Sequence, residues 1–101
     1  MAAETFDPLR ASSIIALAPK VAMQPLGAKE GGVLLRLDSG EMYTVNDTTL
    51  DFLRRVDGKR TIASIVDELI TFIEVDAAVL TADLIEIAGE LQKELLIVTA
   101  E

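Results

Sequence analysis

Glu86 and Glu90 are two carboxylates whose type and spacing could support general acid–base catalysis. Four residues make about one turn of a helix, so both side chains would lie on the same side. The chain of 101 residues contains no histidine and no cysteine, which excludes Ser-His-Asp triads, cysteine nucleophiles and thiolate or imidazole metal ligands. A solvated acidic helix face explains the two glutamates without chemistry. We therefore predict no catalytic residue, no metal site and no cofactor.

Two short motifs are explained by local structure rather than by ligand binding. Asn46-Asp47-Thr48 matches a glycosylation acceptor, but no secretory signal accompanies it, and these residue types also favour a helix N-cap. Gly58-Lys59-Arg60-Thr61 resembles the end of a phosphate-binding loop but lacks the upstream glycine and the long preceding strand. We interpret both as helix boundaries.

The net charge of −8 is concentrated in the second part of the chain. Residues 61–101 carry nine acidic side chains and a single base, Lys93. Such a surface repels the phosphate backbone that supplies most nucleic-acid affinity, so we expect no nucleic-acid partner. No apolar run approaches the ~20 residues that a membrane span needs, so we expect no membrane partner. A small chain without cysteine favours a reducing cytoplasm as its location.

The chain must position its side chains with two kinds of element. Residues 21–25, 33–37 and 42–45 are short and strand-like, and Asp38-Ser39-Gly40 is typical of a hairpin turn. From residue 46 the apolar spacing becomes helical, with Asn46 or Asp47, Thr61 and Asp76 as N-caps of three helices. The first two helices are expected to end near Asp57-Gly58 and near residue 72.

These elements predict an α+β fold, a three-stranded antiparallel meander followed by a three-helix, winged-helix-like bundle. Residues 1–16 are expected to form a flexible N-terminal arm, and residues 17–101 a single domain. Residues 95–98 are apolar enough to form a final strand or a docked tail.

The third helix presents three different flanks when it is projected at ~100° per residue. A core stripe contains Leu80, Leu84, Ile87, Ala88, Leu91 and Leu95. An acidic stripe contains Asp83, Glu86, Glu90 and Glu94. The remaining flank carries Ala78, Ile85, Gly89 and Gln92. Because glycine costs ~1 kcal/mol within a helix, Gly89 indicates either a tight internal helix contact or the close approach of another backbone.

The order of elements and several residues resemble the PqqD family, which is built on the fold of the RiPP precursor peptide recognition element. The resemblance covers about Leu17 to Ile97. It rests on Leu17-Ala18-Pro19, Val33-Leu34-Leu35, Gly40, Tyr43-Thr44-Val45-Asn46, Asp57-Gly58 with Thr61, and Phe72, Val75, Asp83 and Leu91. The family usually has a glycine near the end of the third helix, where this chain has Lys93-Glu94-Leu95.

The resemblance implies a peptide chaperone rather than an enzyme. It would bind the leader of a ribosomally synthesised precursor peptide as an extra strand and present it to a modifying enzyme, a radical SAM enzyme in pyrroloquinoline quinone biosynthesis. Residues 42–45 would be the edge strand that strand addition requires. The expected peptide-binding residues are Met42, Tyr43, Thr44 and Val45 on that strand and Ala82, Ile85, Gly89 and Gln92 on the third helix.

Two other functional classes fit the same elements. A winged-helix-like arrangement would suit DNA binding or protein dimerisation, although the acidic second part disfavours DNA. An adaptor that binds only a folded enzyme is the other alternative. A precursor-peptide reading frame next to this one would distinguish the leader-binding hypothesis from both.

Overall fold

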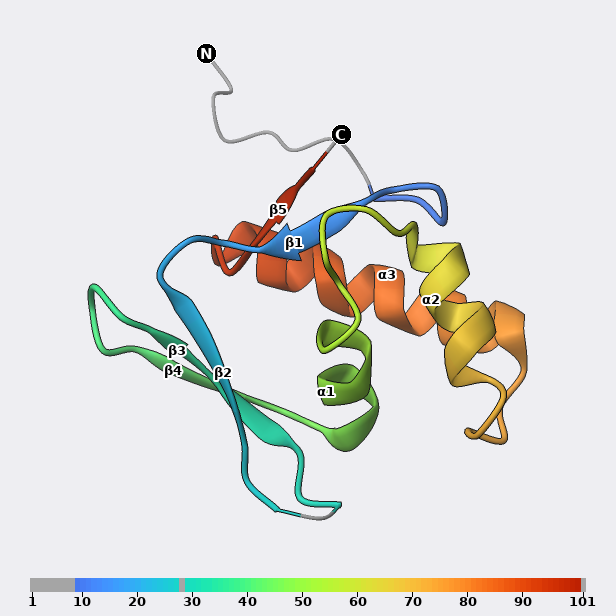
Figure 1. Ribbon diagram of the computed structural model, residues 1–101, viewed down its shortest axis with the longest axis horizontal. Coiled ribbons are helices and arrows are strands. Elements are labelled where there is room, and N and C mark those ends of the chain that lie inside the picture. The colour runs from blue at the N-terminus through green and yellow to red at the C-terminus, as the bar shows by residue number, and fades with distance from the viewer. Residues whose placement is uncertain (1–8, 28, 101) are drawn as a thin grey trace.

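The structure is a computed structural model that describes residues 9–27 and 29–100. The described elements, in chain order, are β1 (Ile15–Leu17), β2 (Val21–Pro25), β3 (Gly32–Arg36), β4 (Met42–Val45), α1 (Asp47–Leu53), α2 (Ile62–Leu69), α3 (Ala77–Lys93) and β5 (Ile97–Thr99). They form two small antiparallel sheets that pack with the three helices around one core (Figure 1). The fold is therefore of the mixed α+β class.

Strands β2, β3 and β4 form the predicted antiparallel meander, in that order. Gly40 closes the hairpin between β3 and β4 with a φ of 78°, a backbone conformation that glycine adopts without strain. Tyr43 and Val45 of β4 are half-buried, whereas Met42 and Thr44 are exposed. This alternation confirms the two faces predicted for residues 42–45 and directs Tyr43 and Val45 toward the interior.

Strands β1 and β5 form a second sheet, which pairs residues 15–17 with residues 97–99. Ile15 is fully buried, and the backbone of Ser13 and Ala11 accepts hydrogen bonds from the start of α2. The predicted arm of residues 1–16 is therefore wrong from residue 9 onward, and residues 1–8 lie outside the described part. A three-residue strand with a partner about 80 residues away leaves no local pattern in the sequence. Of the two alternatives for residues 95–98, the strand is the one observed.

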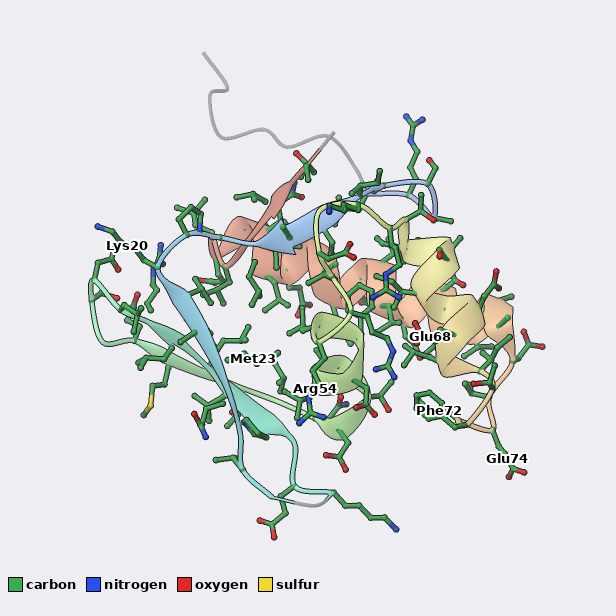
Figure 2. All side chains as sticks on the ribbon, in the orientation of Figure 1. Lys20, Met23, Arg54, Glu68, Phe72 and Glu74 are labelled. Carbon is green, nitrogen blue, oxygen red and sulfur yellow. The ribbon has the colours of Figure 1, made fainter. Side chains whose placement is uncertain are left out.

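All three helices begin at predicted capping residues. The side chains of Asn46, Thr61 and Asp76 accept hydrogen bonds from the backbone N–H groups of Thr49, Ser64 and Ala78, at 2.8, 3.1 and 2.8 Å. The predicted C-terminal ends of the first two helices are wrong. Helix α1 ends at Leu53 and α2 at Leu69, because turns follow both, and Phe72 lies exposed in the connection to α3 (Figure 2).

Helix α3 is held against the core by its apolar stripe and runs behind β1 and α2 in Figure 1. Leu80, Leu84, Ala88 and Leu91 of this stripe are buried. Met23 of β2 lies between the sheet and α1 and packs against the same core (Figure 2). Within the described residues, no helix is long and apolar enough to cross a membrane.

Candidate functional site

The outer edge of β4 carries backbone groups that no described strand uses. In the antiparallel register of β3 and β4, Leu34 lies opposite Tyr43 and Gly32 lies opposite Val45. Two residues further along the ladder, the N–H of Arg36 donates to the carbonyl of Glu41 at 2.9 Å. In an antiparallel ladder, hydrogen-bonded pairs alternate with non-bonded pairs. Tyr43 and Val45 therefore bond to β3, whereas the N–H and C=O groups of Met42 and Thr44 point away from it. These four groups are available to another strand.

The opposite edge of the sheet, at β2, offers one backbone donor fewer to a partner strand than β4 does. The same alternation directs the backbone of Val21, Met23 and Pro25 outward. The N–H of Val21 donates to the carbonyl of Ala18 at 3.2 Å, and Pro25 has no N–H. Met23 is therefore the single outward donor of β2, whereas β4 presents an alternating set of two donors and two acceptors, so β4 is the edge better suited to strand addition.

A groove of about 490 Å³ lies between β4 and α3. It is lined by Tyr43, Thr44, Val45, Asn46 and Thr49 on the β4–α1 side and by Ile87, Glu90, Leu91, Lys93 and Glu94 on α3. Asn46 follows β4 directly and is the N-cap of α1. The first turn of α1 therefore lies next to the end of β4, and Thr49 contributes to the groove. Val45, Ile87 and Leu91 supply the apolar part of the surface.

One end of this groove is fixed by two hydrogen bonds to Glu94. The hydroxyl of Tyr43 donates to Oε1 of Glu94 at 3.0 Å, and Nη1 of Arg36 donates to the Glu94 carbonyl at 3.1 Å. The hydrogen bond to Glu94 raises the pKa of Tyr43 above its ordinary value. These contacts join β3 and β4 to the end of α3 and define the separation of the two walls.

The groove continues along α3 toward the connection between α2 and α3. A second hollow of about 200 Å³ shares Asn46, Thr49 and Ile87 with the first. Its remaining lining residues are Thr48, Ile73, Val75, Leu80, Asp83 and Leu84. Between Asp83 and Glu94 the helix rises about 16 Å, a length that about five residues of an extended strand would span.

The structure brings together only part of the predicted set of site residues. Tyr43, Thr44 and Val45 line the groove, and Met42 lies on the same strand edge. The four predicted α3 residues (Ala82, Ile85, Gly89 and Gln92) do not line it. Ile85 and Ile87 differ by about 200° around the helix, so Ile85, and with it Ala82 and Gly89, lie on the flank away from β4. The structure therefore does not bring these four residues into the groove, and their contact with a peptide stays a prediction.

Gly89 occupies open space on that other flank. A Cβ atom built at this position meets no heavy atom within 4 Å. Neither a tight internal helix contact nor a place in the β4 groove accounts for this glycine. Gln92, by contrast, is buried on the core side of α3.

The groove offers a surface for binding, and its residue types provide little for catalysis. Its titratable side chains are Tyr43, three carboxylates and Lys93. Among the described residues, no group of three or more acidic side chains is arranged to hold a metal ion.

A family model matches residues 31–97, which include β3, β4, all three helices and the start of β5. The family is described as coenzyme PQQ synthesis protein D, PqqD. The chain belongs to the PqqD family. No curated protein is significantly similar to it.

Three solved structures share the fold of this PqqD-family chain at low sequence identity. The PqqD truncation of Methylobacterium extorquens PqqCD, described as a functional and stand-alone RiPP recognition element, has a TM-score of 0.77 at 21% identity and covers 89% of this chain and 94% of its own. A lasso peptide synthetase B1 complexed with the leader peptide gives 0.70 at 23%, covering 83% and 96%. TbiB1 in complex with the TbiA(beta) leader peptide gives 0.68 at 18%, covering 81% and 93%.

Sequence reasoning missed the helix residues that form the groove of this PqqD-family chain. The sequence pattern places Ile87 in the core stripe and Glu90 and Glu94 in the acidic stripe. For the acidic flank with Asp83, Glu86 and Glu90, it leaves open both solubility and a preference for a leader that carries Lys or Arg. The signal that could have identified them is the position of Ile87 at the border between the apolar and acidic stripes. A partly buried residue at such a border is suited to the floor of a groove whose rim is charged.

Proposed function

We propose that this chain binds the leader segment of a ribosomally synthesised precursor peptide as an additional strand along β4 and presents it to a modifying enzyme. The observation that carries the proposal is the open edge of β4 beside the groove on α3. Membership of the PqqD family supports it, as do two structural neighbours that are described as complexes with a leader peptide.

The proposed binding mode divides affinity and selectivity between two parts of the site. The outward N–H and C=O groups of Met42 and Thr44 would form main-chain hydrogen bonds with any extended peptide. Side chains of the added strand that point toward α3 would enter the groove formed by Val45, Ile87 and Leu91. Because strand neighbours lie about 4.8 Å apart, the peptide would lie between β4 and α3 rather than on the surface of the sheet.

The proposal treats the chain as a recognition element without catalytic activity of its own. One of its structural neighbours is described as a stand-alone recognition element, which supports this assignment. A radical SAM enzyme as the partner, and a cytoplasmic location, are further parts of the proposal. They come from the family resemblance and the composition.

The winged-helix-like description of the three helices stays a prediction. DNA binding, the function that it suggests, is disfavoured by the net charge of −8 and by the carboxylates Asp83, Glu90 and Glu94 on α3. Leader binding is therefore the function that we propose.

Thr44→Pro tests strand addition directly. This substitution removes an outward N–H of β4 while the hydrogen bonds of Tyr43 and Val45 to β3 stay in place. A lost hydrogen bond, together with the proline ring facing the incoming strand, should weaken leader binding at least tenfold, since one such bond contributes on the order of 1 kcal/mol and the ring adds a clash. The ligand is the leader of a precursor peptide identified by inspecting the reading frames next to this gene, and it is titrated by calorimetry.

Thr44→Ala is the matched control, because it removes the same exposed side chain and keeps the N–H. It should weaken leader binding far less than Thr44→Pro does. In the unmodified chain, amide chemical shifts of residues 42–45 and of Ile87 and Glu90 should move together on titration. Equal leader affinity for the two Thr44 variants, or shift changes confined to β2 and residues 54–60, would contradict strand addition along β4.

A further inference from the structure

Two carboxylates of the groove have no partner among the described residues, and the inference drawn from them rests on the proposed function. The side chains of Asp83 and Glu90 line the groove and make no hydrogen bond or ion pair with any other described residue. Glu94 adds a third carboxylate, held by Tyr43. Lys93 is the single base among the lining residues.

These carboxylates stand beside an apolar surface rather than on an open face. Ile87 lines both hollows and lies between Asp83 and Glu90 along the helix, with Leu91 and Val45 nearby. A peptide strand in the groove would therefore place side chains against apolar carbon and against uncompensated negative charge at the same time. The end of α3, near Glu94, adds the partial negative charge of a helix C-terminus to the same region.

We propose that the groove selects a basic leader segment, in which a Lys or Arg side chain lies next to an apolar residue that packs on Ile87. The basic side chain would pair with Glu90 or Asp83, and its aliphatic stem would cover part of the apolar surface. An acidic leader would be rejected, because its carboxylates would face Asp83, Glu90 and Glu94 across a narrow groove.

Glu86 provides a matched reference for this charge effect. It lies on α3 four residues before Glu90, is exposed in the same way, and does not line either hollow. Glu86→Lys and Glu90→Lys change the net charge of the chain equally. A difference between them reports the local effect of the groove, whereas an equal change reports the overall field of the protein.

The probe is a displayed library of random twelve-residue peptides, selected on the full chain and counter-selected on Thr44→Pro. We expect the retained peptides to be enriched in Lys and Arg and depleted in Asp and Glu. One retained peptide is then titrated against both variants. An exposed ion pair changes affinity by up to about fivefold and reversal adds repulsion, so Glu90→Lys should weaken binding by about three- to tenfold. Glu86→Lys should leave the affinity within about twofold, the size of a screened long-range charge effect.

A charge exchange completes the test. Replacing the basic residue of the retained peptide by glutamate should weaken its binding to the unmodified chain and restore binding to Glu90→Lys. Retained peptides without a charge preference, or equal losses for Glu86→Lys and Glu90→Lys, would overturn the selection of basic leaders while strand addition stands. A library that yields no peptide dependent on the β4 edge would overturn strand addition, and the inference with it.

Discussion

Around the turn between α1 and α2, carboxylates and guanidinium groups are paired with one another. By contrast, two carboxylates of the groove between β4 and α3 have no partner in the described part of the chain. Arg55 and Arg60 both approach Glu68, at 3.4 and 2.7 Å, and Arg60 also lies 3.4 Å from Asp57. The guanidinium of Arg55 stacks over the ring of Phe72 at 5.1 Å. In the groove, Asp83 and Glu90 face open space.

The difference concerns backbone groups as well as charges. Near the α1–α2 turn, the N–H groups of Lys59 and Arg60 donate to Asp57, and Nη2 of Arg60 donates to the carbonyl of Arg55. At β4, the outward groups of Met42 and Thr44 have no partner strand among the described residues. Unused hydrogen-bonding groups and unpaired charges occur together beside one apolar groove, which is where a ligand would gain most from binding.

Among substitutions that compare the groove with the rest of the chain, Ile87→Ala is expected to have the largest effect on leader affinity. The substitution removes most of an apolar side chain from the floor of both hollows. Burial of an aliphatic side chain contributes about 1.5–3 kcal/mol, and a part of this should be lost, so leader affinity should fall about tenfold. Titration with the leader peptide measures the change.

Ile85→Ala is the control for Ile87→Ala. Both isoleucines are half-buried on α3 and pack against the core, but Ile85 lies on the flank away from β4. Both variants should lose similar stability in thermal unfolding, and only Ile87→Ala should lose affinity. An equal loss of affinity in the two variants would mean that the peptide does not distinguish the two flanks of α3.

A smaller effect, on stability alone, is expected at two positions whose residue types do not suit their backbone conformation, one just after α3 and one within it. Leu95 follows the helix with a φ of 63°, a conformation that favours glycine, and the N–H of Leu96 donates to the Leu91 carbonyl at 2.9 Å as in a Schellman motif. The PqqD resemblance predicts a glycine near this point. Leu95→Gly should therefore raise the free energy of unfolding by about 0.5–1 kcal/mol, since Leu95 is 54% exposed and loses little packing.

Gly89→Ala should stabilise the chain by a similar amount, about 0.5–1 kcal/mol, because the position is helical and unobstructed. Neither variant should change leader affinity, since neither residue lines the groove. Denaturant unfolding and leader titration of both variants provide the measurements. Loss of leader binding in Gly89→Ala would show that the peptide contacts Gly89. The flank of α3 that does not line the groove would then also belong to the binding site.

Local patterns in the sequence were sufficient for most of the elements. The caps at Asn46, Thr61 and Asp76 and the turn at Gly40 depend on residues close in the chain, so their chemistry is visible without the fold. The pairing of Ile15 with Thr99 depends on a contact between the two ends of the described chain, which no local pattern encodes.

The helix residues predicted for the site do not line the groove, for a related reason. Periodicity correctly separated the acidic stripe with Glu90 from the flank with Ile85 and Gly89. Which flank faces β4 depends on how α3 crosses the sheet, and that is decided by long-range packing around Leu84 and Ala88. The more apolar flank, chosen from the sequence as the peptide site, is therefore not the flank that lines the groove beside β4.

The smallest expected effect belongs to the paired region and concerns Asp57. The backbone N–H groups of Lys59 and Arg60, followed by the charge of Arg60, hold the pKa of Asp57 below its ordinary value. A carboxyl whose pKa is lower in the folded chain stabilises the fold above the unfolded-state pKa of about 4 and loses that contribution as the pH falls through the folded value.

Asp57→Asn keeps an oxygen that can accept the two N–H hydrogen bonds but removes the charge. The variant should therefore be less stable than the unmodified chain at pH 7, and the difference should shrink as the pH falls below about 4, where the unmodified carboxyl becomes protonated. Thermal unfolding of both chains between pH 7 and pH 2.5 measures this difference. Glu90→Gln is the reference, because it removes one carboxylate that has no partner and so reports the general effect of net charge at each pH. If the stability of Asp57→Asn and that of Glu90→Gln changed with pH in the same way, the pairing around Asp57 would contribute nothing to stability. The two regions would then differ in the arrangement of their charges but not in what those charges contribute to the fold.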